Sequence, residues 1–310
     1  MADPDKILKL QKIRHWFDQE DGSKSLILHD LNFEVKRGQF ISLVGPSGCG
    51  KSTILKMILG THPPREGAIL LNGEQIHGPT RDVGIVYQKY SLFPNLTTIE
   101  NVALGPLMDR TTTPERLLHP AKSGKLYSGM KQEARELLKQ LNLEHAADLY
   151  PHEMSGGMQQ RAAIAQALIM KPEVLLLDEP FGALDTMTRE QCQRLLLRLY
   201  LSNKTAADSK NLITVILVTH ELSEAILVGD RVIAISQHWN WLDLGFKSCP
   251  GATVVYDKKA PIYPPDIVIK AEEFAEQENE IKKAAFDPNY CQDKKEFLQD
   301  WKQLTGGNHV

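Results

Sequence analysis

The feature that most constrains this chain is the segment Gly45–Thr53, which reads Gly-Pro-Ser-Gly-Cys-Gly-Lys-Ser-Thr. It fits the pattern G-x-x-x-x-G-K-[ST], follows the apolar run Phe40–Val44 and opens the helix-period run Lys51–Leu59. Glycines let backbone N–H groups turn inward around phosphate oxygens, and a helix start adds about half a positive charge there. The pattern therefore predicts a phosphate-binding loop in an α/β fold. A tight strand-to-helix turn without a ligand is the alternative, and the full match in this context disfavours it.

The polar side chains of this loop have separate expected tasks. Lys51 is expected to reach the β- and γ-phosphates of a nucleotide, and the Ser52 hydroxyl to bind Mg²⁺. Cys49 lies beside a helix start and a lysine, which predicts a lowered thiol pKa and a reactive thiol; a buried, inert thiol is the alternative. The residues predicted to bind the nucleotide phosphates are Gly45, Pro46, Ser47, Gly48, Cys49, Gly50, Lys51, Ser52 and Thr53.

Length and composition bound the remaining possibilities. The 310 residues suffice for one large α/β domain with a smaller appendage, and the formal net charge of -3 gives no global basic footprint for nucleic acid. The four cysteines form no C-x-x-C pair, so neither a zinc site nor a disulfide framework is expected. No signal peptide is expected from the first residues, and no apolar run approaches the roughly 18 residues that would span a bilayer.

The pattern along the chain predicts where the helices and strands lie. Residues 7–35 read as two or three strands split by a turn at Asp21-Gly22, and residues 94–167 read as mostly helical. Residues 109–130 are polar and irregular, and predict an inserted loop. Helix-length stretches separate the remaining β-branched runs, which is the rhythm of a parallel sheet. These further strands are expected at 67–71, 83–87, 174–177, 213–218 and 231–235, with a linker at 263–266 and a charged helix at 271–285.

Two carboxylates end the apolar run Val174–Leu177. Asp178 is expected to hold the magnesium, through water, and Glu179 to polarise the attacking water as general base. A parallel strand places its last residues at the carboxyl edge of the sheet, where ligands bind in doubly wound folds. Two surface acids at a strand end are the alternative, which weakens beside a phosphate loop.

A second anion site is predicted at a helix start further along the chain. Met154–Arg161 reads Met-Ser-Gly-Gly-Met-Gln-Gln-Arg and precedes a helix-period run. A Ser hydroxyl at the N-cap, close backbone approach and the helix dipole favour an anion there. Two such sites indicate a nucleotide held between two surfaces, whereas a capped helix start without a ligand is the alternative.

The order of these motifs resembles the ATP-binding cassette (ABC) transporter ATPases over about residues 6–260. The resemblance rests on the phosphate loop, Gln88, Ser155-Gly156-Gly157, Asp178-Glu179, Gly182-Ala183-Leu184-Asp185 and His220. The family signature is Leu-Ser-Gly-Gly-Gln, and this chain departs from it at Met154 and Met158. The resemblance implies an α/β P-loop NTPase (RecA-like) fold, with a mostly parallel sheet core, an antiparallel β subdomain and an inserted α-helical subdomain at about 94–167. The ATPase domain is expected at 1–262 and a C-terminal helical extension at 263–310.

Carried over by position, the resemblance implies further roles. Gln88 would contact Mg²⁺ and the lytic water, and His220 would bind the γ-phosphate and position that water. Asp185 would lie at a dimer interface, while Ser155 and Gly157 would bind the γ-phosphate of ATP held by a second copy. The family stacks an aromatic residue on adenine. Trp16 and Phe17 are the candidates, and Phe17 is favoured by its place after the strand. The implied metal ligands are Ser52, Gln88 and Asp178.

A finer resemblance is to the nitrate/sulfonate/taurine/bicarbonate importer ATPases. It rests on the phosphate loop, on Gly78–Gly84, and on Asp178–Asp185 followed by Thr188-Arg189. It implies an ATP-hydrolysing subunit, using ATP and Mg²⁺, that energises a membrane importer of a small anion from the cytoplasmic face of the membrane. The implied partners are a second copy in a head-to-tail dimer, transmembrane permease subunits and, indirectly, a substrate-binding protein, with no nucleic acid. The alternative is a soluble ABC-type ATPase with a role such as iron–sulfur assembly.

Overall fold

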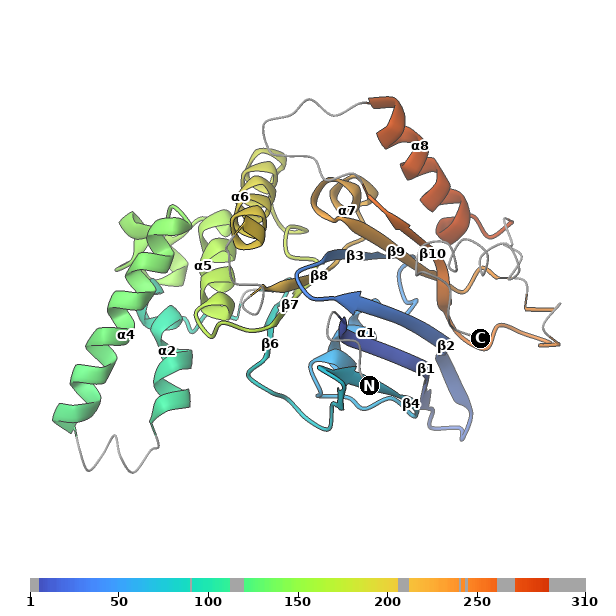
Figure 1. Cartoon of the computed structure of the whole chain (residues 1–310), viewed down its shortest axis with the longest axis horizontal. Coiled ribbons are helices and arrows are strands. Elements are labelled where there is room, and N and C mark those ends of the chain that lie inside the picture. The colour runs from blue at the N-terminus through green and yellow to red at the C-terminus, as the bar shows by residue number, and fades with distance from the viewer. Residues whose placement is uncertain are drawn as a thin grey trace. The chain divides into compact units, whose positions relative to one another are not determined.

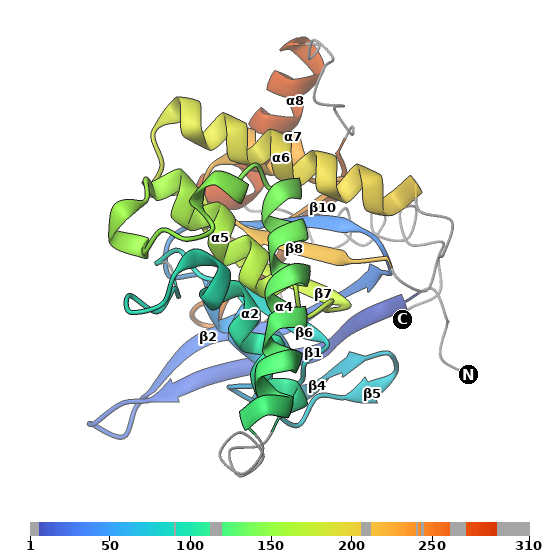
Figure 2. The ribbon, with the colours of Figure 1, turned by 90° about the vertical axis from the view of Figure 1, so that its left-hand side faces the viewer.

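A computed structural model describes residues 6–89, 91–111, 120–205, 212–239, 241–242, 245–260 and 271–289. The chain forms two compact units: Met1–Thr80 with Lys204–Val310, and Arg81–Asn203. Figures 1 and 2 label the helices and strands of both units where there is room. Over the described residues, no helix combines the length and the apolar character that crossing a bilayer requires.

The first unit contains an antiparallel sheet built on a long hairpin. β1 (Lys6–Asp18) pairs with β2 (Lys24–Lys36) on one side and with β4 (Glu66–Leu71) on the other, and the short β5 (Glu74–Gln75) follows at the edge. Apolar residues of β1 and β2 are buried at alternating positions, which is the pattern of strands with one face on a core. The hairpin and its turn are where the sequence pattern predicted them.

A second sheet in this unit carries the phosphate loop. β3 (Phe40–Val44) lies between β8 (Thr214–Val218) and β9 (Arg231–Ser236), parallel to both, and β10 (Thr253–Lys259) adds an antiparallel edge. All five residues of β3 are buried, as expected for a central parallel strand. Two helices of this unit follow these strands, α1 (Lys51–Ile58) after β3 and α7 (Leu222–Val228) after β8.

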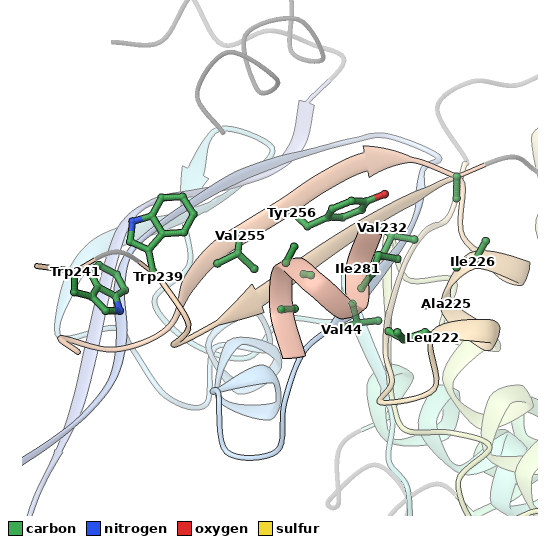
Figure 3. Packing of buried hydrophobic residues seen from close by; sticks show 14 residues of the cluster. Val44, Leu222, Ala225, Ile226, Val232, Trp239, Trp241, Val255, Tyr256 and Ile281 are labelled. Atoms are coloured by element: carbon green, nitrogen blue, oxygen red, sulfur yellow. The ribbon is translucent and has the colours of Figure 1, made fainter. Parts of the chain in front are cut away.

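The predicted C-terminal helix is part of the core of this unit. α8 (Ala271–Ile281) continues into a π-helical turn at Lys282–Phe286. Figure 3 shows Ile281 of α8 in one buried cluster with Val44, Leu222 and Tyr256. The helix thus packs over β9, β10 and α7 through its apolar side. The linker predicted at 263–266 lies outside the described residues.

The second unit combines a pair of parallel strands with a group of helices. β6 (Val83–Val86) pairs with β7 (Val174–Asp178), and α5 (Gly156–Leu168) connects toward β7. α2 (Thr98–Arg110) and α4 (Pro120–Gln140) lie side by side in both views (Figures 1 and 2). The unit also contains two short 3-10 helices, Glu144–Ala146 and Pro151–Glu153, and the start of α6 (Thr186–Thr205). The mostly helical character predicted for 94–167 is confirmed.

One expectation for this unit is wrong. Residues 109–130 were expected to form an irregular inserted loop, but α2 extends to Arg110 and residues 120–130 form the first half of α4. Residues 112–119 lie outside the described part of the chain. The reason is packing, because Met130, Ala134, Leu138 and Leu141 form a buried stripe at helical spacing. The polar residues that suggested a loop, such as Ser128 and Gly129, lie on the exposed side of that helix.

Candidate functional site

The phosphate loop leaves the end of β3 and has a backbone that only glycine tolerates at two positions. A Cβ on Gly45 would lie 2.2 Å from the carbonyl oxygen of Ile235, so a side chain has no room there. Gly50, the residue before α1, has a φ of +96°, and a Cβ there would meet the side chains of Ile27 and Leu28 at under 3.0 Å. The loop is therefore fitted closely between β9 and β2.

Lys51 is turned into this loop. Its side chain is only 7% exposed, and its Nζ donates hydrogen bonds to the carbonyl oxygens of Gly45 at 2.6 Å and Pro46 at 2.9 Å. A buried ammonium needs such partners, since desolvation of an unpaired charge is very costly. The loop thus holds a cation at its centre, where phosphate oxygens would replace the carbonyl groups as partners. Ser52 is the next residue, in the first turn of α1, and it is exposed.

The lowered pKa expected for Cys49 is contradicted. Burial raises the pKa of the Cys49 thiol above its ordinary value, although the neighbouring Lys51 charge acts in the opposite direction. The side chain is 2% exposed and its Sγ lies 3.9 Å from Lys51 Nζ. Desolvation therefore outweighs the local positive field that the sequence pattern emphasised. Cys49 is therefore a buried thiol with a raised pKa, which agrees with the alternative of a buried, inert thiol.

His220 is placed beside the phosphate loop by strand pairing within the same unit. β3 and β8 are parallel neighbours, with Leu43 opposite Val218, and the backbone N–H of Thr219 donates to the Leu43 carbonyl at 3.3 Å. The two strands therefore end at the same edge, where His220 and Gly45 follow them. The His220 side chain is half exposed, and its Nε2 lies 3.8 Å from a carboxylate oxygen of Glu221.

Sequence reasoning missed the residues that shape the turn at His220. The Thr219 hydroxyl donates a 2.5 Å hydrogen bond to the buried Glu224 carboxylate and accepts one from the Glu221 backbone N–H at 3.1 Å. A carboxylate four residues after His220 at the start of a short helix carries no recognisable motif, so no local signal was available to find it. The pair fixes the backbone on both sides of His220.

The hairpin presents one of the two candidate adenine-stacking residues to solvent. Phe17 is 44% exposed, whereas Trp16 is half-buried with Lys24 Nζ 4.5 Å from its ring centroid. A ring with an open surface can accept a planar base, and a ring covered by a lysine has one face already in use. The exposure of Phe17 agrees with the preference for this residue that its place in the sequence indicated.

In the second unit, strand pairing brings the acidic residues near Gln88. β6 and β7 are parallel, with Val86 opposite Leu177. Gln88 lies two residues after Val86, and Glu179 lies two residues after Leu177, so both follow the same edge of the strand pair. A Cβ on Gly182 would lie 3.4 Å from Gln88 Nε2. Glu179 has a φ of +46°, which is a left-handed backbone conformation. This conformation is strained for any residue that has a side chain, and such strained residues cluster at functional sites.

The second anion motif forms the N-terminus of α5. Ser155 is the N-cap, and its exposed hydroxyl oxygen accepts from the Met158 backbone N–H at 3.3 Å. Gly157 is buried, and a Cβ there would lie 2.1 Å from the Thr188 methyl carbon. Met154, one of the two departures from the family signature, is buried, and its Sδ accepts a hydrogen bond from the Thr98 hydroxyl at 3.0 Å.

Asp185 caps the start of α6 next to this motif. Its carboxylate accepts from the Thr188 backbone N–H at 3.1 Å. Hydrogen bonds with the Thr188 side chain and backbone lower the pKa of Asp185, so the exposed carboxylate is ionised at neutral pH. Because Thr188 also lies over Gly157, the turn at Asp185 and the start of α5 form one connected surface.

The predicted magnesium ligands have suitable chemistry. Ser52, Gln88 and Asp178 offer hydroxyl, amide and carboxylate oxygens, which is the donor class that Mg²⁺ prefers. Within the described residues, no group of three or more His, Cys, Asp or Glu side chains is arranged to hold a metal ion.

A phosphate loop after a buried parallel strand, with a buried lysine inside it, defines a P-loop nucleotide-binding protein. The family model for ABC transporters matches residues 28–182. The chain belongs to the ABC transporter family, which confirms the resemblance and the fold class predicted from its motifs.

Relatives and a solved structure agree with this membership. The chain is 40% identical to the bicarbonate transport ATP-binding protein CmpC of Synechocystis over 71% of this chain and 30% of CmpC. It is 37% identical to the aliphatic sulfonates import ATP-binding protein SsuB of Bacillus cereus over 74% of this chain and 81% of SsuB. The dimeric structure of a post-hydrolysis state of an ATP-binding cassette bound to ADP and Pi matches with a TM-score of 0.61 and 30% identity, over 83% of this chain and all of that chain. The match to CmpC spans less than a third of that protein's length.

Proposed function

We propose that this chain is the ATP-hydrolysing subunit of an ABC importer for a small anion such as nitrate, a sulfonate or taurine, or bicarbonate. The observation that carries the proposal is the phosphate loop with Lys51 buried at its centre and bonded to the carbonyl oxygens of Gly45 and Pro46. The names of the bicarbonate and sulfonate relatives support the anion class. Both of these relatives are transport proteins, which favours import over a role in iron–sulfur assembly.

The phosphate loop and the hairpin would hold the nucleotide from the first unit. Backbone N–H groups of Gly45–Thr53 and the Lys51 ammonium bind the β- and γ-phosphates, because preorganised donors act strongly where water is excluded. Phe17 stacks on the adenine through its exposed surface. His220, at the neighbouring strand end, binds the γ-phosphate and positions the attacking water.

The second unit would supply the groups that activate the water. Glu179 accepts the proton of the attacking water as general base, and Gln88 orients that water. Ser52, Gln88 and Asp178 would hold Mg²⁺. Bound there, the ion would neutralise the negative charge of the phosphates.

Hydrolysis in this proposal needs a second copy of the chain. Ser155 and Gly157 bind the γ-phosphate of ATP held by the other copy, and Asp185 lies at the interface. The exposed N-cap hydroxyl of Ser155 supports this, as does the dimeric structure of the related cassette. ATP then bridges two copies arranged head to tail, and loss of the γ-phosphate favours their separation.

The dimer would act on transmembrane permease subunits from the cytoplasmic face of the membrane, as a peripheral subunit. A substrate-binding protein would deliver the anion, and nucleic acid takes no part. The ATPase domain at 1–262, with a helical extension at 263–310, belongs to the same proposal. In it, the surface around Gln88 passes the motion of the dimer to the permease.

Substitution of Glu179→Gln tests the catalytic assignment. We expect ATP binding to be kept and steady-state hydrolysis to fall by roughly 10²–10⁴-fold, the usual range for loss of a general base. Glu144→Gln, an exposed carboxylate in the same unit, is the matched control and should leave both unchanged. Hydrolysis at the original rate in folded Glu179→Gln protein would refute the assignment.

A further inference from the structure

His15 is a buried polar residue on β1 that the proposed chemistry does not use. Its side chain is 5% exposed, and both ring nitrogens, Nδ1 and Nε2, are buried without a hydrogen-bond partner among the described residues. Buried polar atoms are satisfied in the large majority of cases, so an imidazole with two unpaired nitrogens requires an explanation. A hydrocarbon side chain would fill the same space without that cost.

The contact that His15 does make is with the ring of Phe17. The two ring centroids are 4.9 Å apart and the ring planes are inclined at 86°. Residues two apart on a strand share a face, so β1 itself sets the two rings together. A perpendicular arrangement places the positive edge of one ring against the π face of the other, which favours one orientation over the alternatives.

The charge state of His15 suits this contact. Burial lowers the pKa of His15, and repulsion from the Arg65 guanidinium lowers it further, so the imidazole is neutral at neutral pH. The nearby cationic side chains lie against the ring of Trp16 rather than that of Phe17. Lys24 Nζ lies 4.5 Å and the Arg65 guanidinium 6.0 Å from the ring centroid of Trp16. Phe17 therefore has a neutral aromatic neighbour, and its side chain remains 44% exposed.

The residues of β2 that lie opposite His15 in the hairpin also pack against the phosphate loop. His15 is paired with Leu28 and Trp16 with Leu26, so the ladder skips Ile27 in a β-bulge. The side chains of Ile27 and Leu28 both approach Gly50, the last glycine of the loop, where a Cβ would lie 2.9 Å and 2.8 Å from them. His15 and the bulge thus lie next to the residues of β2 that pack on the phosphate loop, which places the Phe17 ring on the same hairpin.

We infer that His15 is a positioning residue, which holds the ring of Phe17 in the orientation that stacks on the purine base of the bound nucleotide. The inference rests on the proposed function, because it requires a nucleotide in the phosphate loop with its base at Phe17. It assigns to the unpaired imidazole a role in base recognition that leaves phosphate binding untouched.

The test compares ATP with inorganic tripolyphosphate, which has the phosphates and no base. Affinities of the full chain for both are measured by calorimetry with Mg²⁺ for the original protein, His15→Leu, His15→Phe, Phe17→Leu and the His15→Leu/Phe17→Leu double variant. We expect His15→Leu to weaken ATP binding about threefold to tenfold, the value of a perpendicular aromatic contact, with tripolyphosphate binding unchanged. His15→Phe keeps a ring edge and should stay within about twofold of the original protein.

The double variant separates positioning from a general effect on the fold. If His15 acts through Phe17, His15→Leu has no further effect on ATP affinity once Phe17 is leucine. Ile13→Val, at a fully buried position on the same strand, is the matched control and should lower the thermal midpoint while keeping the ratio of the two affinities.

Three results would overturn the inference: equal losses for ATP and tripolyphosphate, a loss in His15→Phe as large as in His15→Leu, or a full effect that persists in the Phe17→Leu background. Failure of the proposed function looks different. If the original protein bound ATP no more tightly than tripolyphosphate, the base site at Phe17 itself would be wrong.

Discussion

The phosphate loop and the start of α5 both open a helix with an anion-binding sequence, but they are built differently. In the phosphate loop, the Lys51 ammonium is turned inward onto the loop carbonyl oxygens, and Gly45 is required because the Ile235 carbonyl oxygen blocks a Cβ. At the start of α5, the Ser155 hydroxyl is exposed, and Gly157 is required because the Thr188 methyl group is in the way. The polar side chain of the phosphate loop is therefore buried inside its own turn, whereas that of the α5 turn is exposed.

This difference indicates which of the two turns can tolerate changes in its sequence. At Gly45 the phosphate loop is bounded by a backbone oxygen of its own sheet, which no side-chain rotation can move, whereas side chains of β2 bound it at Gly50. The start of α5 is bounded by the side chains of Thr188 and Met154, which can change with their neighbours. This agrees with the sequence, since the loop matches its pattern in full while the second motif departs from the family signature at Met154 and Met158.

The largest effect in this comparison is expected for Lys51→Ala. Loss of the cation inside the loop removes a preorganised partner of the transferred phosphate, and we expect hydrolysis to fall by about 10²–10³-fold, the usual result of removing one such group. The measurement is steady-state ATPase activity together with nucleotide binding. Lys56→Ala, an exposed lysine on the same helix, is the control and should retain activity. Normal hydrolysis in Lys51→Ala would show that the loop is not the phosphate site.

A smaller effect on stability is expected for alanine substitutions at Gly45 and Gly157, and the two variants should differ in whether a second substitution can rescue them. Gly45→Ala meets a backbone oxygen, and we expect overpacking to destabilise the protein by about 1–3 kcal/mol, with loss of ATP binding. Gly157→Ala meets the Thr188 methyl group, so the added substitution Thr188→Ser, which deletes that methyl group, should restore thermal stability. Ile235 offers no equivalent rescue for Gly45→Ala, because its carbonyl oxygen belongs to the backbone. If Thr188→Ser failed to restore the Gly157→Ala protein, the proposed contact would not be the source of the loss.

The parts that could be predicted from the sequence are those with a local pattern. The phosphate loop, the acidic end of β7 and the N-cap at Ser155 each follow from residues within about one turn of each other. The burial of Cys49 could not be predicted, because it depends on how the loop packs against other strands, and desolvation outweighed the local field that Lys51 creates. Local patterns thus predicted where these turns and strand ends lie, whereas they did not predict which side chains the fold would bury.

Elements set by distant packing were the ones that sequence reasoning missed. The first half of α4 contains Gly and Ser and looks like a loop, and its helix forms because Met130 continues a buried stripe. β10 was not predicted as a strand, and it is held at the sheet edge by pairing with β9 and by two 2.6 Å hydrogen bonds from Arg231 to the buried Asp257 carboxylate. The pair Thr219–Glu224 at His220 belongs to the same class, since its meaning appears only in the folded turn.

The smallest effect is expected for Met154→Leu, which restores the family residue at one of the two departures. Met154 is buried, and its Sδ is one of two acceptors available to the Thr98 hydroxyl, the other being the Leu149 carbonyl oxygen at 2.9 Å. A hydroxyl has a single proton to donate, so the Leu149 bond can take over when the sulfur is removed. Since leucine and methionine have similar volumes, we expect a stability change below about 1.5 kcal/mol and ATPase activity within about twofold.

The informative control for Met154→Leu is Thr98→Val, which removes the hydroxyl from the other side of the same contact. Thr98→Val leaves both acceptors without that donor, although the Thr98 backbone N–H still bonds the Leu149 carbonyl oxygen at 2.8 Å, so it should destabilise the protein more than Met154→Leu. Thermal unfolding of both variants and of the double variant measures how much the sulfur contributes. A large loss in Met154→Leu would break the comparison, because the start of α5 would then be as rigidly specified as the phosphate loop, and its methionine would be a requirement of this chain rather than a tolerated departure.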